Sequence, residues 1–229
     1  MARVLRNPGS HVVVAIDGPS GVGKSTVSRA VAAQLGLSYL DTGATYRAAT
    51  LVVLRAGIDP YSEASILSEL SDHSIDYSEI GILLDGESVA FDVRSDEVTK
   101  NVSAVSAHPR VRSEIVTMQR RWVEDKDGDA VVEGRDIGTV VFPDAAVKIY
   151  LTARPLVRAT RRSRDAEASG KTLEEIAGEI EARDHADSTR KASPLRPAED
   201  ATVIDTSELD IDAVVQTIID LASPVPPTA

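Results

Sequence analysis

Cysteine is absent from this 229-residue chain, which excludes disulfide bonds, thiolate metal sites and a cysteine nucleophile. Phe, Trp and Tyr together make up only 3% of the residues, so Val, Ile, Leu and Ala must form the core. Apolar runs stay well short of the ~20 residues that a transmembrane helix needs, and residues 1–10 lack the apolar stretch of a signal peptide. We therefore expect a cytoplasmic protein with no membrane partner.

Basic residues are outnumbered, because 25 Lys and Arg stand against 36 Asp and Glu, and the net charge is −11. Proteins whose main task is to bind nucleic acid usually carry a basic face, so we expect no nucleic-acid partner. Five arginines nevertheless cluster in one short stretch: Arg154, Arg158, Arg161, Arg162 and Arg164. Such a cluster suits a small, highly charged anion such as a nucleotide, although a solvent-exposed helix face explains the cluster alone equally well.

What the sequence does contain is a phosphate-binding loop pattern: residues 18–25 read GPSGVGKS, which matches G-x-x-x-x-G-K-S. Its glycines let successive backbone N–H groups turn inward around a phosphate chain, where a side chain would intrude. Lys24 supplies a positive charge for the β- and γ-phosphates, and the Ser25 hydroxyl is the expected ligand of Mg²⁺. The residues expected to bind ATP are Asp17, Gly18, Pro19, Ser20, Gly21, Val22, Gly23, Lys24, Ser25 and Thr26.

The segments around this loop have the order that the pattern requires. Residues 11–17 form a continuous apolar run typical of a buried strand. Apolar residues then recur at helical spacing over 27–35, and Gly36 supplies a C-terminal stop. A glycine-rich turn with an incidental lysine would not need this order, so a phosphate-binding loop is the better interpretation.

Five buried strands are predicted in all, alternating with helices. This alternation predicts an α/β fold with a parallel five-stranded sheet flanked by helices, of the P-loop NTPase type. The other strands are expected at 38–41, 130–133, 147–151 and 201–205. The helices are expected after residue 41 to near Gly57, from Asp59-Pro60 through Leu70, at 95–107 and 109–124, after residue 151 to Gly170, from a capping box at Thr172 and Glu175 to about Ser188, and at 211–219. The tail from Ser223 is proline-rich and expected to be loose.

Residues 74–91 change character. Short strands at 74–78, 80–84 and 87–91, with the turn signal Asp85-Gly86, predict a small antiparallel element. It is too short to hold its own core, so we interpret it as an insert in one domain that spans 1–229, and we expect a monomer.

Arginines outside the loop indicate a second anion. Transfer of a phosphoryl group between two anions requires a site that neutralises both, and the arginine fork binds phosphate bidentately. Arg47 and Arg135 each follow a predicted strand, so they should lie at the edge of the sheet where the loop lies.

Two further sets of charged residues each share one helix face because of their spacing. The first set is Arg158, Arg161 and Arg162, and the second is Arg183, Asp187 and Arg190. Two such faces beside a phosphate-binding loop predict a mobile lid that brings charge to the transferred phosphoryl group when it closes. A simple surface ion pair is the alternative for Arg183 and Asp187.

These segments together resemble the bacterial cytidylate kinases. The resemblance rests on residues 17–25, 41–47, 133–143 and 183–190, of which the second and third segments are the specific ones, and it covers about 12–221. It implies transfer of the γ-phosphoryl group of ATP to CMP or dCMP, with Mg²⁺ as cofactor and these nucleotides as the partners. No residue need act as a covalent nucleophile, because the acceptor phosphate oxygen attacks directly.

The resemblance also implies a division of the chain and a set of site residues. The core would comprise about 10–57, 125–153 and 200–222, the insert that binds the nucleoside monophosphate (NMP) about 58–124, and the helical lid about 154–190. The catalytic residues would be Lys24, Arg135, Arg158, Arg161 and Arg162. The residues that bind the acceptor would be Thr42, Tyr46, Arg47, Ser103, Arg112, Arg135, Asp136, Arg183, Asp187 and Arg190.

Among these, the resemblance assigns the cytosine ring to Ser103, Arg112 and Asp136. Polar chemistry agrees, because a carboxylate accepts from the cytosine amino group and an arginine donates to its ring nitrogen and carbonyl. Tyr46 would pack beside the base or sugar. One departure is Glu133, where the family often has aspartate, and the sequence leaves open whether the longer side chain meets Mg²⁺-bound water.

Two alternatives remain open from the residues. A kinase for UMP, AMP or a non-nucleotide metabolite would keep the phosphoryl transfer and change the acceptor. A non-catalytic nucleotide-binding protein would keep only the loop, but the sequence has neither the N-K-x-D motif of GTPase switches nor the signature run of ABC-type ATPases. The four histidines show no metal-ligand spacing and are expected to be structural or on the surface.

Overall fold

The computed structural model describes residues 12–78, 80–164 and 170–222. Three predictions fall outside these residues: the first residue of the strand expected at 11–17, the segment 165–169 of the arginine-bearing helix, and the tail from Ser223. Within the described residues, no helix combines the length and the apolar character needed to cross a membrane.

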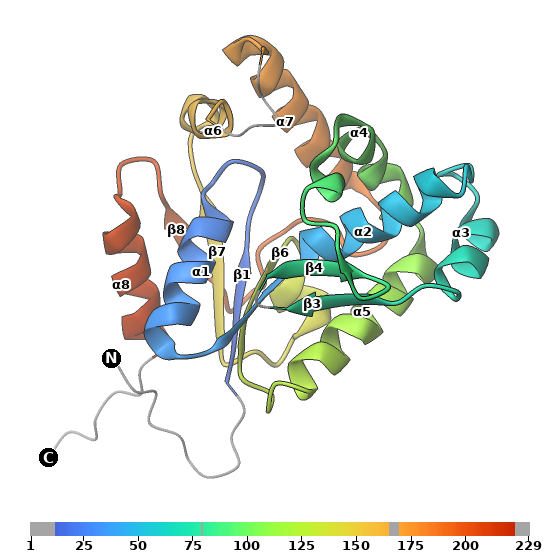
Figure 1. Cartoon of the computed structure of the whole chain (residues 1–229). Helices are drawn as coiled ribbons and strands as arrows, with labels where there is room; N and C mark the ends of the chain where they lie inside the picture. Colours follow the sequence, from blue (N-terminus) through green and yellow to red (C-terminus); the bar gives the residue numbers. More distant parts are fainter. Residues whose placement is uncertain (1–11, 79, 165–169, 223–229) are drawn as a thin grey trace, which may run out of the picture.

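A five-stranded sheet forms the centre of the molecule (Figure 1), and every neighbouring pair of its strands is parallel. The strand order is β2-β6-β1-β7-β8. The strands are β1 (Val13–Asp17), β2 (Ser38–Asp41), β6 (Ala130–Gly134), β7 (Val147–Thr152) and β8 (Thr202–Asp205). The predicted α/β fold with a parallel five-stranded sheet is therefore confirmed.

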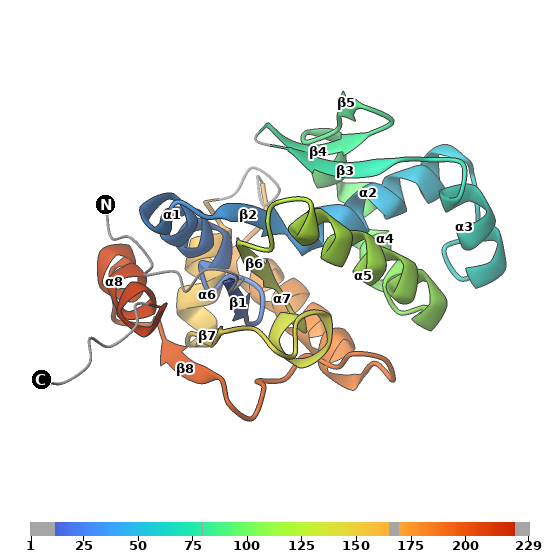
Figure 2. The same cartoon turned by 90° about the horizontal axis from the view of Figure 1, so that it is seen from below.

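Helices cover both faces of this sheet. On β1, Val14 and Ile16 pack into one buried cluster with α1 (Lys24–Leu35) and α8 (Ile211–Ala222). Ala15, between them, belongs to the opposite cluster with α2 (Thr42–Arg55) and α5 (Pro109–Glu124). Figure 2 shows α1 and α8 together on one side of the sheet and α5 on the other. A strand buried on both faces needs apolar residues throughout, which is why β1 reads as a continuous run.

The prediction of five buried strands is wrong for β8. This strand lies at the edge of the sheet beside β7, and Ile204 is its only buried residue, while Val203 is 56% exposed. An edge strand has one neighbour and one covered face, so its apolar residues do not all reach the core.

The insert contains a small antiparallel sheet of order β3-β4-β5, made of β3 (Ile75–Ser78), β4 (Gly81–Leu84) and β5 (Glu87–Ser88). The predicted turn is confirmed, since Asp85 and Gly86 both have positive φ, at 52° and 82°. The third strand is shorter than expected because buried Val89 turns into the core and the short helix η1 (Asp92–Arg94) follows. Helices α3 (Glu63–Leu70) and α4 (Asp96–Val105) complete this part.

The expected helix start at Asp59-Pro60 is wrong. The Asp59 carboxylate accepts from the N–H of Tyr61, only two residues on, and the Asp59 carbonyl accepts from Ser62. These bonds close a turn over residues 59–62, and no helix follows Asp59 directly. The helix α3 begins at Glu63, after Ser62.

Two helices follow β7 and lie beyond the carboxyl ends of the strands, where α7 approaches α4 (Figure 1). They are α6 (Pro155–Arg162) and α7 (Leu173–Thr189), and they pack on each other through Ala159, Ile176 and Ile180. The capping box at Thr172 and Glu175 is confirmed. The helix that carries the clustered arginines ends at Arg162, earlier than predicted.

A π-helix, η2 (Ile137–Val141), follows β6 and was not anticipated from the sequence. Both carboxylate oxygens of Asp17, at the end of β1, accept backbone N–H groups here, from Ile137 and Gly138 at 2.8 Å each. Burial raises the pKa of Asp17 to about 6. Asp17 therefore ties the start of the phosphate-binding loop to the segment after β6.

Candidate active site

The loop at 18–25 joins the end of β1 to the start of α1. A Cβ atom at Gly18 would lie 2.3 Å from the Leu151 carbonyl oxygen, and one at Gly21 would lie 2.8 Å from that of Arg158. Both glycines also have positive φ, at 149° and 77°. The loop therefore needs glycine at these positions to pass so close to β7 and α6.

Lys24 bends back over this loop. Its Nζ donates to the carbonyl oxygens of Gly18 and Pro19, at 2.8 Å each. Burial lowers the pKa of Lys24 below its usual value, and Arg135 lowers it further, whereas nearby Glu133 raises it. An arriving anion would relieve this crowding of positive charge.

One pocket joins the phosphate-binding loop to the insert and the two lid helices. Eight basic and four acidic side chains line it, which gives an excess of four positive charges on a chain whose net charge is −11. The basic residues are Lys24, Arg47, Arg94, Arg112, Arg135, Arg162, Arg183 and Arg190, and the acidic ones are Asp41, Glu133, Asp136 and Asp187. Ser25, Thr42, Tyr46 and Ser103 also line this pocket.

At one end of this pocket lies a buried ion pair. Arg112 on α5 donates to Asp136 at 2.6 Å, and both side chains are only 5% exposed. Arg112 also donates to the Ser106 carbonyl oxygen at 3.1 Å and lies 4.9 Å from the ring centre of Tyr46. Ser103 lines the same end. The structure thus brings together the three residues predicted to bind the cytosine ring, Ser103, Arg112 and Asp136, and Tyr46, predicted to pack beside the base or sugar.

Several buried polar atoms of this pocket lack a hydrogen-bond partner among the described residues. They are Tyr46 Oη, Arg112 Nε, Glu133 Oε2 and Arg190 Nη2. Leaving a buried polar group unpaired costs about 1–3 kcal/mol each, so these atoms indicate a polar ligand that the pocket is built to hold.

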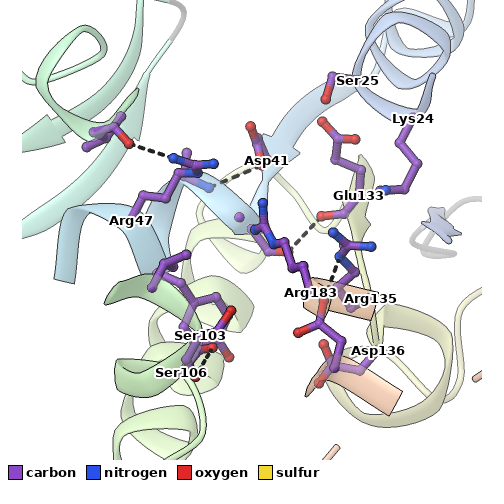
Figure 3. A pocket seen from close by; sticks show the side chains of 18 of the residues that line it. Lys24, Ser25, Asp41, Arg47, Ser103, Ser106, Glu133, Arg135, Asp136 and Arg183 are labelled. Atoms are coloured by element: carbon purple, nitrogen blue, oxygen red, sulfur yellow. Dashed lines mark hydrogen bonds and ion pairs between the residues drawn. The ribbon is translucent and has the colours of Figure 1, made fainter. Parts of the chain in front are cut away.

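Basic groups from separate elements converge between this end and the loop, and Figure 3 shows Lys24, Arg135 and Arg183 pointing into one space. Arg135, just after β6, donates to the Gly18 carbonyl oxygen at 3.0 Å and to Ser20 Oγ at 2.7 Å. Burial lowers the pKa of Arg183 to about 9, with Arg135 and Arg47 adding to the decrease.

Two more predicted residues complete this region. Arg47 on α2 donates to the Val93 carbonyl oxygen at 3.0 Å and to Thr99 Oγ1 at 2.9 Å. Arg190 lies after α7, 3.4 Å from Asp187, which is itself 3.3 Å from Arg135. Residues predicted from four separate segments thus face one pocket.

The lid arginines contact the loop directly. Arg158 Nε donates to the Ser20 carbonyl oxygen at 2.7 Å, and its Nη2 pairs with Asp184. Arg161 donates to the Val22 carbonyl oxygen at 3.1 Å and to Thr206 Oγ1 at 2.7 Å. Neither lines the basic pocket, whereas Arg162 does.

The Asp184 carboxylate on α7 contacts the loop and two of these arginines. It accepts from the backbone N–H of Ser20 at 3.1 Å, pairs with Arg158 and lies 3.4 Å from Arg135. The lid and the loop are therefore joined in this structure by an internal carboxylate.

Other predicted residues have structural contacts. Thr42 Oγ1 donates to the Glu133 carbonyl oxygen at 2.7 Å. Both oxygens of the Asp17 carboxylate accept backbone N–H groups of η2. Thr26 lies exposed on α1 and does not line the basic pocket.

Oxygen atoms suited to Mg²⁺ lie between the loop and β6. Ser25, Asp41 and Glu133 line this part of the pocket, and hydroxyl and carboxylate oxygens are ligands that Mg²⁺ prefers. No group of three or more His, Cys, Asp or Glu residues among the described residues could hold a metal ion alone. The free oxygen of Glu133 fits a Mg²⁺ ion that takes most of its other ligands from phosphates and water.

Sequence reasoning did not single out Asp184, Thr206 or Tyr39 as site residues. Thr206 follows β8, at the carboxyl edge where ligands gather, so its position could have marked it. Asp184 and Tyr39 carry no local signal, since their contacts are with Ser20 and Glu133, which are distant in sequence.

Comparison with known proteins agrees with this geometry. A family model described as "Cytidylate kinase" matches residues 14–224. A protein named cytidylate kinase from Mycobacterium leprae (strain Br4923) is 51% identical over 220 residues, covering 93% of this chain and 96% of that protein. One of the same name from Rhodococcus opacus (strain B4) is 53% identical over 212 residues, covering 90% and 92%.

Proposed function

We infer how this site works from one premise: the chain belongs to the cytidylate kinase family. It is an enzyme that transfers the γ-phosphoryl group of ATP to CMP or dCMP, giving ADP and CDP or dCDP.

One observation carries these assignments. A pocket with an excess of four positive charges connects the phosphate-binding loop to a buried Arg112–Asp136 pair. The loop can bind the phosphates of the donor. The excess positive charge can neutralise two polyanions that meet end to end. The buried ion pair can form hydrogen bonds with the edge of a base.

We propose that Asp136 accepts from the amino group of cytosine, while Arg112 and Ser103 bind its ring nitrogen and carbonyl. The unpaired Nε of Arg112 supports this assignment. Tyr46 would pack beside the base or sugar, where its unpaired hydroxyl can reach the ligand. Uracil offers a carbonyl in place of the amino group, so a buried carboxylate would reject it.

For the rest of the acceptor, we propose that Arg47, Arg135 and Arg190 bind its phosphate and that Arg183 and Asp187 bind the sugar hydroxyls. Thr42 would hold β6 in place beside them through its bond to Glu133. The lowered pKa of Arg183 supports the phosphate assignment, because burial of Arg183 beside Arg135 and Arg47 favours an anion nearby.

For the donor, we propose that residues 17–26 bind the phosphates of ATP and that Lys24 neutralises charge on its β- and γ-phosphates. Arg158, Arg161 and Arg162 would cover the transferred group from the lid, and the contacts of Arg158 and Arg161 with the loop support this. An oxygen of the acceptor phosphate attacks the γ-phosphorus, and the bond from that phosphorus to the ADP oxygen breaks. The protein contributes position and charge neutralisation.

We propose that Mg²⁺ is required and that Ser25 binds it. When bound, the ion neutralises charge that develops on the phosphate oxygens. Glu133, and Asp41 beside it, would accept from water molecules in its shell, which the free Glu133 Oε2 supports.

We propose that the core (10–57, 125–153 and 200–222) holds ATP, the insert (58–124) binds the acceptor and the lid (154–190) closes over both. We also propose that the enzyme is a cytoplasmic monomer, because the loop, the insert and the lid of a single chain already line one pocket. Light scattering of the purified protein tests the oligomeric state.

A panel of acceptors tests the proposed function. ADP formation from ATP and Mg²⁺ should depend on CMP or dCMP and be weaker with UMP or AMP at equal concentration. A stronger response to UMP or AMP would move the assignment to another acceptor. ATP binding without turnover of any acceptor would leave a non-catalytic nucleotide-binding protein.

A further inference from the structure

The Glu133 carboxylate on β6 is held at one of its two oxygens. The hydroxyl of Tyr39, on the neighbouring strand β2, donates to Glu133 Oε1. Glu133 is only 2% exposed, and its other oxygen, Oε2, has no hydrogen-bond partner among the described residues. A carboxylate that is fixed at one oxygen can present its other oxygen to the pocket that Glu133 lines.

The unpaired oxygen belongs to the side of the pocket where the phosphates and Mg²⁺ are proposed to bind. Lys24, Ser25 and Glu133 line this side together, and Figure 3 shows the Glu133 carboxylate pointing toward Ser25. A water molecule bound to Mg²⁺ would therefore lie within reach of Glu133 Oε2.

The Tyr39 ring is itself held on two sides. The Arg29 guanidinium lies 4.5 Å from its centre, and the Tyr77 ring meets it edge-on at 6.1 Å. Tyr77 in turn meets Trp122 edge-on at 6.1 Å, and Trp122 Nε1 donates to the Tyr77 carbonyl oxygen at 2.5 Å. The phenol thus has a fixed position set by α1, β3 of the insert and α5.

We infer that Tyr39 is a positioning residue, which holds Glu133 Oε1 so that Oε2 accepts from the water shell of Mg²⁺. This inference rests on the proposed function of Glu133. It answers the question that the longer side chain raised, since a glutamate needs a fixed partner to present one oxygen where an aspartate is often found.

Equilibrium binding tests the inference without relying on turnover. The affinity for ADP is measured by calorimetry with Mg²⁺ and again with EDTA, and the ratio of the two affinities reports the contribution of the ion. Tyr39→Phe should lower this ratio about tenfold, as loss of an outer-shell partner does at other metal sites. The affinity without Mg²⁺ should stay the same, which a loss of stability alone would not produce.

Tyr77→Phe is the matched control, because it removes a hydroxyl from the same ring stack but not from Glu133. It should keep the wild-type ratio. If Tyr39→Phe also keeps the wild-type ratio, or lowers both affinities equally, the inference is overturned.

Glu133→Gln separates this inference from the proposed function. A lowered ratio in Glu133→Gln with an unchanged one in Tyr39→Phe would overturn only the inference. An unchanged ratio in Glu133→Gln would overturn the proposed function of Glu133, and the inference with it. If both variants lower the ratio, the double variant should show no further loss, because the two residues act through one contact.

Discussion

Replacement of Asp136 by asparagine tests how the pocket would recognise its base. The substitution keeps the size of the side chain but removes the charge that pairs with Arg112 at 2.6 Å. The carboxylate would also lose its strength as an acceptor for the cytosine amino group. Both effects act at the base end of the pocket and leave the phosphate-binding loop intact.

The size of the effect follows from the bond that is weakened. A buried hydrogen bond to a charged group contributes about 1.5–3 kcal/mol, which corresponds to a loss of about 10- to 150-fold in kcat/KM for CMP. The new amide can donate to the carbonyl that uracil presents at this position, so kcat/KM for UMP should fall less or rise. The CMP-to-UMP ratio should therefore drop by at least about tenfold.

A steady-state assay of ADP formation with each acceptor measures this ratio. Arg112 is left buried without its counter-charge, which can cost about 3–5 kcal/mol of stability. The ratio of kcat/KM values from one preparation cancels the fraction of folded enzyme, so it isolates recognition from stability.

Asp129→Asn is a matched control for this prediction. Asp129 is also buried, but its carboxylate accepts from Val12 N–H at 2.9 Å, at the amino end of the sheet. That variant should keep the wild-type ratio. If Asp136→Asn lowers kcat/KM equally for CMP and UMP, Asp136 positions its loop and does not recognise the base.

Three further changes have clear expected outcomes. Lys24→Ala should lower kcat by about a thousandfold or more, because it removes a charge from the transferred phosphates, with circular dichroism unchanged; substantial remaining activity would contradict this. Arg158→Lys should lower kcat about tenfold or more, since lysine lacks the planar fork through which Arg158 bonds Ser20 by Nε and Asp184 by Nη2, and a wild-type kcat would count against the lid assignment. The His73–Asp85 contact raises the pKa of His73, so its stabilisation should be complete below the unfolded-state pKa of ~6.5 and disappear as pH rises through the higher folded-state value. Urea unfolding of His73→Asn against wild type measures this, and a difference that grows with pH would refute it.

Local signals in the sequence were sufficient for much of the fold. The glycine loop, the turn at Asp85-Gly86 and the capping box at Thr172 each depend on residues a few positions apart, and the structure has all three. The parallel sheet followed from the apolar runs, because a strand buried on both faces reads as a nearly continuous apolar run.

Features that depend on distant contacts were not predictable in the same way. The π-helix η2 forms where Asp17 binds two N–H groups about 120 residues further along the chain, and no local pattern marks it. The orientation of Glu133 depends on β2 lying beside β6, which strand assignment alone does not determine. Asp59-Pro60 misled the helix prediction because the same residues also favour turns.

The joining of lid and loop through Asp184 has a consequence for the anions that the site will admit. A carboxylate tethered to the lid competes for Arg135, Arg158 and the Ser20 N–H at an effective concentration on the order of millimolar. Inorganic phosphate, which has a single phosphate group, would have to displace the Asp184 carboxylate while making few contacts of its own. A triphosphate that also engages Lys24 and the loop amides gains several contacts at once. We therefore expect Asp184 to keep these cations ordered when no ligand is bound, and to favour ligands with several phosphates over simple salts.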